Sequence, residues 1–248
     1  MSTTDLHVLR RGSSGERIVM VHGSFKRGSE LFFGPQMPLA EQYRLLIPHR
    51  RNYGLSPGSG QKTFAQEAQD LLDVIGEEPA HLLGVSYGGV IALLAAAKAP
   101  DRILSLTVSD PPAFSVARGQ AAVETLMSRM TPIWTLSEPA EILSRFYGAL
   151  GINLPVIEER LTEADKRDIV AGVSEPLPFE VDIAPDVLAG AVFPRMVFAG
   201  GWHPAFDTTQ AHLAAQINAE LVTLAGRGHN VHYHPDFNGH WRRVLMPR

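Results

Sequence analysis

Short apolar runs of strand length alternate with helical patterns along most of this 248-residue chain, and this alternation limits the folds open to it more than any other feature. A strand, a helix and a second strand in succession build a parallel sheet whose faces are covered by helices. We predict strands at residues 6–10, 17–22, 43–48, 80–85, 103–109, 195–199 and 220–224. We predict helices at residues 63–75, 87–99, 207–217 and 237–244. The pattern therefore predicts an α/β fold with a mostly parallel, doubly wound sheet.

The alternation is interrupted between residues 111 and 193, where helical patches and scattered prolines occur without a clear buried strand. We therefore predict one α/β core, built from residues 1–110 and 194–248, with a helical insertion at residues 111–193. Thr63 and Gln66 have the spacing of a capping box, which marks the start of a helix at this point.

The composition excludes several classes of protein. With 22 Lys and Arg against 26 Asp and Glu, the chain has a net charge of −4, whereas a nucleic-acid-binding domain is usually basic. It has no cysteine, which excludes a thiol nucleophile, disulfides and cysteine-ligated metals. Residues 1–5 are polar rather than leader-like, and no apolar run approaches the roughly 18–20 residues that span a bilayer. We therefore expect a soluble, cytoplasmic protein that binds neither nucleic acid nor membrane.

Ser86 lies between a predicted strand and a predicted helix with no loop on either side. The sequence Gly84-Val85-Ser86-Tyr87-Gly88 matches the G-x-S-x-G pattern, and its two glycines remove side chains that would clash in so sharp a turn. Such a turn would raise the Ser86 hydroxyl above the sheet, and the helix end would direct the Tyr87 N–H towards a developing oxyanion. This context favours a nucleophilic serine over the alternative, a tight turn in which the serine only satisfies the backbone.

Four segments together resemble the α/β-hydrolase fold family, and the resemblance covers almost the whole chain. They are VMVHGSF (residues 19–25), IPHRRNYGLSPG (residues 47–58), the turn at Ser86 and LAGRGHNVHYHP (residues 224–235). The resemblance implies a serine hydrolase of the esterase or perhydrolase type, whose helical cap is the 111–193 insertion. It also implies that the second oxyanion donor is the backbone N–H of Ser24, with Phe25 as the alternative, and that His22 orients this loop.

His229 is the candidate base. A serine nucleophile needs a base whose pKa is near neutral, and histidine is the side chain that offers this without perturbation. The position of His229 after the serine, in a Gly-Arg-Gly-His turn near the C-terminus, matches the order in the family that the chain resembles. The alternative is a metal site formed with His232, His234 and His240, but their spacing fits no common zinc motif. We therefore predict that these three histidines pack or lie at the surface, and that the protein uses no metal or other cofactor.

The acid that would orient His229 departs from the pattern in many members of that family. His203 occupies the position where they carry an aspartate, in the segment AGGWHPAF, and a histidine brings no negative charge to a neighbouring imidazolium. Asp110, which ends a predicted strand, is at a position that some members use, and we favour it. Asp207 remains open, although it has the sequence features of a helix N-cap with a capping box. A site without any acid also remains open.

The insertion is rich in large apolar side chains, which would either line a cleft for a small, largely uncharged substrate or form the core of the insertion itself. They are Phe114, Met127, Met130, Trp134, Phe146, Tyr147 and Phe179. Lys26, Arg27, Arg50 and Arg51 lie on loops near the predicted site, and we expect them to be solvated charges. We expect the protein to act on a small molecule as a monomer or homodimer.

These features predict a cofactor-independent serine hydrolase of small, largely apolar esters or related acyl compounds, with Ser86, His229 and Asp110 as a triad and an acyl-enzyme intermediate. Alternatives for the same site are a carbon–carbon bond hydrolase, a perhydrolase and a lyase. A non-catalytic ligand receptor is a further alternative, motivated by His203 in the acid's usual place. Ser86 disfavours the relatives that use a carboxylate nucleophile, and no G-x-G-x-x-G motif follows a strand to suggest dinucleotide binding.

Overall fold

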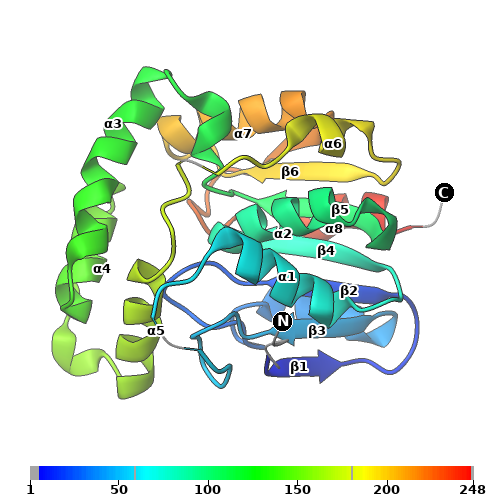
Figure 1. Cartoon of the computed structure of the whole chain (residues 1–248), viewed down its shortest axis with the longest axis horizontal. Coiled ribbons are helices and arrows are strands. Elements are labelled where there is room, and N and C mark those ends of the chain that lie inside the picture. Colours follow the sequence, from blue (N-terminus) through cyan, green and yellow to red (C-terminus); the bar gives the residue numbers. More distant parts are fainter. Residues whose placement is uncertain (1–5, 59, 180, 247–248) are drawn as a thin grey trace.

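The computed structural model describes residues 6–58, 60–179 and 181–246, so the polar residues 1–5 lie outside the described part. In these residues one seven-stranded sheet has the order β1-β3-β2-β4-β5-β6-β7 (Figure 1). The strands are β1 (Val8–Arg11), β2 (Arg17–Val21), β3 (Arg44–Pro48), β4 (Ala80–Val85), β5 (Ile103–Ser109), β6 (Arg195–Ala199) and β7 (Glu220–Thr223). The edge strand β1 pairs antiparallel with β3, and every other pairing is parallel. The predicted, mostly parallel sheet is confirmed, and each strand overlaps the run that predicted it.

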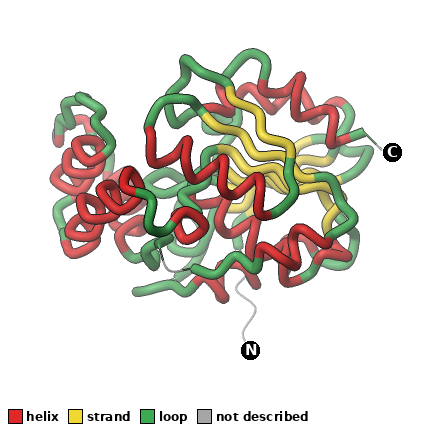
Figure 2. The backbone as a smooth tube through the Cα atoms, turned by 90° about the horizontal axis from the view of Figure 1, so that it is seen from above, coloured by secondary structure: helices red, strands yellow, loops and turns green. Residues whose placement is uncertain are grey.

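Helices cover both faces of the sheet, because the central strands present apolar side chains to both sides. On one face pack α1 (Phe64–Ile75), α2 (Tyr87–Lys98), α6 (Pro185–Gly190) and α7 (Pro204–Gln216). On the other face pack the 3₁₀ helix η1 (Gly34–Glu41) and α8 (Phe237–Leu245), where Trp241 is completely buried. Figure 2 shows the strands enclosed between these helices. In the part of the chain that is described, no helix is both long and apolar enough to cross a membrane.

The starts of two helices show what the sequence predicted well and what it did not. α1 begins with the predicted capping box at Thr63. α7 begins earlier than predicted, at Pro204, and its N-cap is His203, whose Nδ1 accepts a hydrogen bond from the N–H two residues later at 3.1 Å. The prediction that Asp207 caps this helix is therefore wrong. Proline has a fixed φ that suits the first helical position, so Pro204 starts the helix and leaves Asp207 inside the first turn.

Residues 111–193, which we call the inserted segment, form helices and loops, with no strand among the residues that are described. Its helices are η3 (Phe114–Ala117), α3 (Ala121–Met130), η4 (Thr131–Thr135), α4 (Pro139–Ala149), η5 (Glu158–Arg160), α5 (Glu163–Val173) and α6. Figure 1 shows α3, α4 and α5 beside the carboxyl ends of the parallel strands. Their apolar side chains form a separate cluster, together with Phe25 and Phe206 from the rest of the chain. Helices α3, α4 and α5 of the inserted segment therefore lie at the end of the sheet at which α/β folds usually bind ligands, whereas α6 packs on one face of the sheet.

The turn from β4 to α2 is tight because two glycines let backbone segments touch. A Cβ added at Gly84 would lie 2.5 Å from the carbonyl oxygen of Gly88. A Cβ added at Gly88 would lie 2.4 Å from the carbonyl oxygens of both Val21 and His22, where β2 ends. These neighbours are backbone atoms, so neither can move aside without displacing a strand or the helix.

We expect Gly88→Ala to lower the free energy of unfolding by about 2–4 kcal/mol, towards the upper end of what overpacking costs. The matched control is Gly148→Ala in α4, where an added Cβ would meet nothing within 4 Å. Alanine there should leave stability unchanged or raise it by up to about 1 kcal/mol, because glycine is the poorer helix former. Urea unfolding followed by circular dichroism measures both variants. A Gly88→Ala protein as stable as wild type would contradict the packing described for this turn.

Candidate active site

Ser86 and Asp110 are neighbours because they directly follow adjacent strands. Val85 at the end of β4 pairs with Ser109 at the end of β5. The Ser86 N–H donates to the Ser109 carbonyl at 2.9 Å, and the Asp110 N–H donates to the Phe198 carbonyl of β6 at 2.9 Å. Parallel strands bring their carboxyl ends to one edge of the sheet, so both side chains are presented at that edge.

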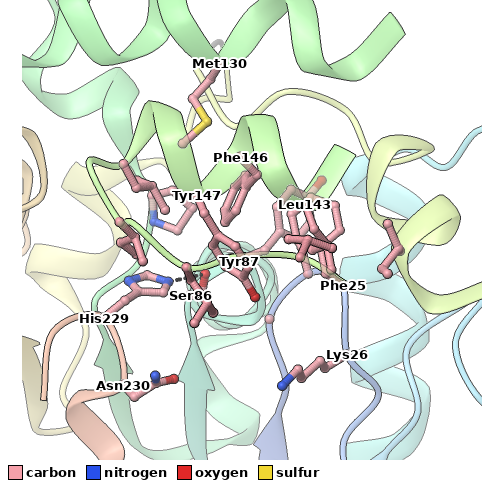
Figure 3. Close-up of a pocket in the computed structure, with 18 of the residues that line it drawn as sticks. Phe25, Lys26, Ser86, Tyr87, Met130, Leu143, Phe146, Tyr147, His229 and Asn230 are labelled. Atoms are coloured by element: carbon pink, nitrogen blue, oxygen red, sulfur yellow. Dashed lines mark hydrogen bonds between the residues drawn. The ribbon is translucent and has the colours of Figure 1, made fainter. Parts of the chain in front are cut away.

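His229 bridges the side chains of Ser86 and Asp110. It lies in the loop between β7 and α8, and its Nε2 is 2.8 Å from Ser86 Oγ (Figure 3). Its Nδ1 is 2.6 Å from Asp110 Oδ2, and the Asp110 side chain is fully buried. When Nδ1–H donates to the carboxylate, Nε2 can accept the proton of the serine hydroxyl. The structure thus brings together the three residues that the sequence suggested as nucleophile, base and acid.

Ser86 and Asp110 both have a backbone conformation that is unusual for a residue with a side chain. Their φ angles are +53° and +51°. Such a conformation costs roughly 1–3 kcal/mol and persists only where the surrounding structure imposes it. At Ser86 the direct reversal from strand to helix imposes it. Strain of this kind is concentrated at functional sites, which makes this edge of the sheet the candidate active site.

Two backbone N–H groups near Ser86 are candidates for an oxyanion hole. The Tyr87 N–H is the first of α2, and an N–H in the first turn of a helix has no acceptor within that helix. Gly23 packs so closely on Ser86 that a Cβ added to it would lie 2.9 Å from the Ser86 Cβ. This close approach brings the next residue, Ser24, to the wall of the same cavity as Ser86.

Phe25, the alternative to Ser24, already uses its N–H. That N–H donates to the Tyr53 hydroxyl at 3.2 Å, and Phe25 has a left-handed backbone with φ of +66°. Its ring packs edge-on against Phe146 at 4.7 Å between centroids, in a space that exists because residue 172 of α5 is glycine. Of the two residues weighed as the second donor, this geometry favours Ser24.

His22 is buried and holds the backbone of the same loop. The Arg50 N–H donates to its Nε2 at 2.9 Å, which leaves the proton on Nδ1 to donate to the Gly23 carbonyl at 2.8 Å. Burial, together with the positive charge of Arg50, lowers the pKa of His22 well below its usual value. His22 is therefore neutral near pH 7, and both of its ring nitrogens are engaged with the backbone.

Trp202 is part of the site, although sequence reasoning does not identify it. Its Nε1–H donates to Asp110 Oδ2 at 2.8 Å, the same oxygen that accepts from His229. Trp202 precedes His203, which occupies the acid's usual position but here caps α7. Asp207 lies in the first turn of that helix, where burial and the charge of Asp110 raise its pKa. Of the two candidate acids, Asp110 is the one that hydrogen-bonds to His229.

Arg50 is buried, so the expectation that it is a solvated charge is wrong. Its side chain is 3% exposed and donates to Glu67 at 2.7 Å and to Glu175 at 2.6 Å. Charges that lose their water need such partners. Two other basic residues of these loops also form ion pairs, Arg27 with Asp168 and Arg51 with Asp70. Lys26 is exposed and lies in the cavity wall. Glu175 is a second residue that sequence reasoning does not identify.

The other C-terminal histidines have separate surroundings. His232 is buried against Phe32, whose carbonyl lies 3.2 Å from its Nε2, and burial lowers the pKa of His232 to about 3. His234 lies 3.9 Å from Asp236, and His240 Nδ1 lies 2.8 Å from a guanidinium nitrogen of Arg243. Across the described residues, no three His, Asp or Glu side chains are grouped in a way that could hold a metal ion.

A cavity of about 500 Å³ opens above Ser86 and His229 (Figure 3). Most of its wall comes from the inserted segment, and it includes Phe114, Met130, Trp134, Phe146, Tyr147 and Phe179. Met127, the remaining apolar residue singled out in the sequence, packs against the cluster behind this wall. Lys26, Arg160 and Asp165 add charge to a lining that is otherwise mainly apolar. A cavity with these properties suits a small-molecule ligand with an apolar part.

The chain is similar in sequence to known hydrolases. The sequence pattern of the alpha/beta hydrolase family matches residues 18–237. Lipase LipV of Mycobacterium tuberculosis is 30% identical over 171 residues, which cover 64% of this chain and 61% of the lipase. The pimeloyl-[acyl-carrier protein] methyl ester esterase of Aliivibrio salmonicida is 33% identical over 132 residues, which cover 52% of this chain and 49% of the esterase. The matches therefore span only part of the length of these relatives.

Solved structures extend the likeness to the whole fold. A hydrolase from Pseudomonas aeruginosa superposes with a TM-score of 0.71 at 23% identity, covering 98% of this chain and 94% of that protein. The family match over residues 18–237 includes the turns that carry Ser86, Asp110 and His229. The chain therefore belongs to the alpha/beta hydrolase family.

Proposed function

We propose that the protein is a cofactor-independent serine hydrolase of small, largely apolar esters or related acyl compounds. One observation carries the proposal. A line of hydrogen bonds runs from Ser86 Oγ through His229 to the buried Asp110, and it begins at the floor of an apolar cavity. A hydroxyl, an imidazole and a carboxylate in this order form the triad that activates a serine for acyl transfer. The relatives named as a lipase and as a methyl ester esterase support an ester as the substrate class.

In the proposed reaction, His229 Nε2 takes the hydroxyl proton of Ser86 while Oγ attacks the carbonyl carbon of the ester. The π electrons of the carbonyl move to its oxygen and form a tetrahedral intermediate. The intermediate collapses, the bond to the alcohol breaks, and the departing alkoxide takes the proton from His229, which leaves an acyl group on Ser86. Water, deprotonated by the same nitrogen, then attacks the acyl carbon, and the carboxylic acid is released as Ser86 regains its proton. Asp110 stays ionised and stabilises the imidazolium in both halves.

The N–H groups of Ser24 and Tyr87 would bind the oxyanion of each tetrahedral intermediate. Backbone donors are fixed in direction and cannot ionise, so they need little reorganisation when the charge develops. They come from two different parts of the chain, the loop after β2 and the first turn of α2. Their relative position therefore depends on the packing that holds these two parts together.

We further propose that the inserted segment is the lid of the active site and that its aromatic side chains bind the acyl or alcohol group of the substrate. The cavity of about 500 Å³ has the size of a site for a small molecule, and Met130 and Phe146 face into it (Figure 3). Figure 2 shows, beside the sheet, the group of helices that Figure 1 labels α3, α4 and α5.

A non-catalytic receptor is a weaker proposal than an enzyme. The reason to consider a receptor is His203, which stands where a carboxylate usually orients the histidine. Asp110, directly after β5, supplies a carboxylate instead, with its Oδ2 2.6 Å from His229 Nδ1. The arrangement can therefore activate Ser86 without an acid at residue 203.

Hydrolysis of p-nitrophenyl esters with acyl chains of graded length tests the proposed function, together with a fluorophosphonate that reacts with activated serines. We expect turnover of short and medium acyl chains and a mass increase of one phosphonyl group, which peptide mapping should locate at Ser86. A protein that hydrolyses no ester in the series and does not react with the phosphonate would support the receptor instead.

A further inference from the structure

A cluster of buried charges lies behind the loop that carries Ser24. The side chains of Arg50, Lys62, Glu67 and Glu175 are at most 3% exposed. Arg50 follows β3, Glu67 belongs to α1, and Glu175 follows α5 in the inserted segment. The two cations balance the two anions, which is what the burial of ionised groups requires. None of the four takes part in the proposed acyl transfer, so the cluster needs another explanation.

The Glu175 carboxylate accepts hydrogen bonds from four side chains. Its Oε2 accepts the hydroxyl of Ser24. Its Oε1 accepts from Arg50 at 2.6 Å, from the Tyr53 hydroxyl at 2.8 Å and from Lys62 at 3.4 Å. Burial alone would raise the pKa of Glu175, but Arg50 and Lys62, with the hydrogen bonds from Ser24 and Tyr53, hold this pKa below its usual value. Glu175 is therefore an anion near neutral pH.

Both residues of the proposed oxyanion hole are attached to the same short stretch of the inserted segment. Ser24 is attached through its hydroxyl to Glu175, and the Tyr87 hydroxyl donates to the Pro176 carbonyl at 3.0 Å. In each case the side chain makes this contact, and the backbone N–H of the same residue remains to bind an oxyanion. The contact between Ser24 and Glu175 joins residues that are 151 positions apart in the chain.

The strained backbone after Ser24 explains why the loop needs an anchor. Phe25 has a φ of +66°, a conformation that a residue with a side chain leaves unless its surroundings hold it. Its N–H donates to the Tyr53 hydroxyl, and that hydroxyl in turn donates to Glu175. Glu175 therefore holds Ser24 directly and Phe25 through Tyr53.

We infer that Glu175 is a positioning residue, which fixes the Ser24 N–H in the oxyanion hole and so makes the hole depend on the inserted segment. The inference rests on the proposed function, because it assigns Glu175 a part in the same reaction. Glutamine cannot replace the carboxylate in this role. It has one acceptor oxygen and an NH₂ group that accepts nothing. If that oxygen stays with Arg50, Tyr53 and Lys62, the NH₂ group faces Ser24, whose hydroxyl must then accept instead of donate. The hydrogen bond to a carboxylate that holds Ser24 is thus replaced by a weaker, neutral one, and Ser24 is held less firmly.

In Glu175→Gln we expect kcat for ester hydrolysis to fall by about 10–100-fold while KM changes by less than about threefold. Removal of one oxyanion donor in a serine hydrolase costs about 10²–10³-fold in kcat, and a displaced donor should cost a part of that. The rate of inactivation by the fluorophosphonate should fall in parallel, because its tetrahedral adduct occupies the same hole. If Glu175 had only a structural role, the folded fraction of Glu175→Gln would keep both the wild-type kcat and the wild-type rate of inactivation.

Glu67→Gln is the matched control. Glu67 is the other carboxylate on Arg50, it is equally buried, and the chemical change is the same, but in the described residues it makes no hydrogen bond to Ser24 or Tyr53. We expect this variant to lose thermal stability to a similar extent and to keep kcat within about threefold of wild type. Thermal unfolding of both variants separates the effect on stability from the effect on kcat.

Ser24→Ala provides a second route if Glu175→Gln does not fold, because it removes the anchored hydroxyl and keeps the N–H. Ser24→Ala should also lower kcat, and adding Glu175→Gln to Ser24→Ala should lower kcat by a smaller factor than Glu175→Gln does in the wild type.

Unchanged kcat in Ser24→Ala and Glu175→Gln, or equal losses of kcat in Glu67→Gln and Glu175→Gln, would overturn the inference. If turnover requires Ser86 but is insensitive to Glu175, the inference alone fails. If wild type shows no turnover that requires Ser86, the proposed function fails and the inference fails with it.

Discussion

Replacing Ser86 with alanine is expected to lower kcat by at least about 10⁴-fold for every ester that the wild type hydrolyses. The Ser86 hydroxyl is the group that would bond to the acyl carbon, and it lies 2.8 Å from His229 Nε2, the nitrogen that would take its proton. Without it, the oxyanion hole and substrate binding still act, so the residual rate should exceed that in water. The measurement is kcat and KM on the ester series, and labelling by the fluorophosphonate should disappear.

Ser86→Gly separates loss of the hydroxyl from damage to the fold. Glycine adopts a φ of +53° without strain, whereas alanine keeps the strain of the serine. Relief of roughly 1–3 kcal/mol should raise the Tm of Ser86→Gly by a few degrees, and the Tm of Ser86→Ala should stay near that of wild type. Both variants should be equally inactive. An alanine variant that keeps more than about a tenth of the wild-type kcat would contradict the nucleophilic role.

The sheet can be predicted from the sequence because its central strands are short, mainly apolar runs. β4 is buried along its whole length, and the predicted strands at residues 80–85 and 103–109 have the ends that the structure has. A strand covered on both faces is mainly apolar, although buried polar residues such as His81 and Thr107 occur inside these two strands. Their ends are marked by the residues outside them, Pro79 and Ser86 around β4 and Arg102 and Asp110 around β5. The start of α7 is harder to predict, because Asp207 has the composition of an N-cap while Pro204 actually begins the helix.

The three residues of the candidate site can be predicted because short turns attach them to strands. Ser86 and Asp110 each follow a strand directly, and the parallel pairing of β4 with β5 then makes them neighbours. Glu175 cannot be found in this way. It lies in a loop of the inserted segment, and its contact with Ser24 arises from how that segment packs on the core. Such packing leaves no local periodicity in the sequence.

Arg50 and Trp202 show two further limits. Arg50 stands next to another arginine, and no local pattern distinguishes the one that is buried against Glu67 and Glu175 from its more exposed neighbour. One sequence feature points to Trp202. It directly precedes His203, the position at which an aspartate is expected and a histidine stands. An indole N–H at that position can donate to a carboxylate that arrives from another strand, as it does to Asp110.

Asp110→Asn is expected to lower kcat by about 10³–10⁴-fold while the fold and the serine remain intact. The carboxylate accepts from both His229 Nδ1 and Trp202 Nε1 through one oxygen, and it is fully buried. Asparagine has nearly the same shape, but it carries no charge to stabilise the imidazolium. If the asparagine NH₂ group faces His229 Nδ1, that nitrogen must accept and the imidazole proton moves to Nε2. Nε2 can then no longer take the proton of Ser86. Steady-state kinetics on the ester series measures the loss, and KM should change little.

Asp207→Asn is the control that distinguishes the candidate acids. Asp207 is the other aspartate considered as the acid. Its partners are the backbone N–H groups of Gly201 and Trp202, and asparagine can still offer them an oxygen. We expect this variant to keep kcat within about threefold of wild type. A large loss in Asp207→Asn with little loss in Asp110→Asn would reverse the assignment of the acid. Small losses in both would mean that Ser86 and His229 act without a carboxylate, and that the hydrogen bond between Asp110 and His229 serves only to hold the imidazole in place.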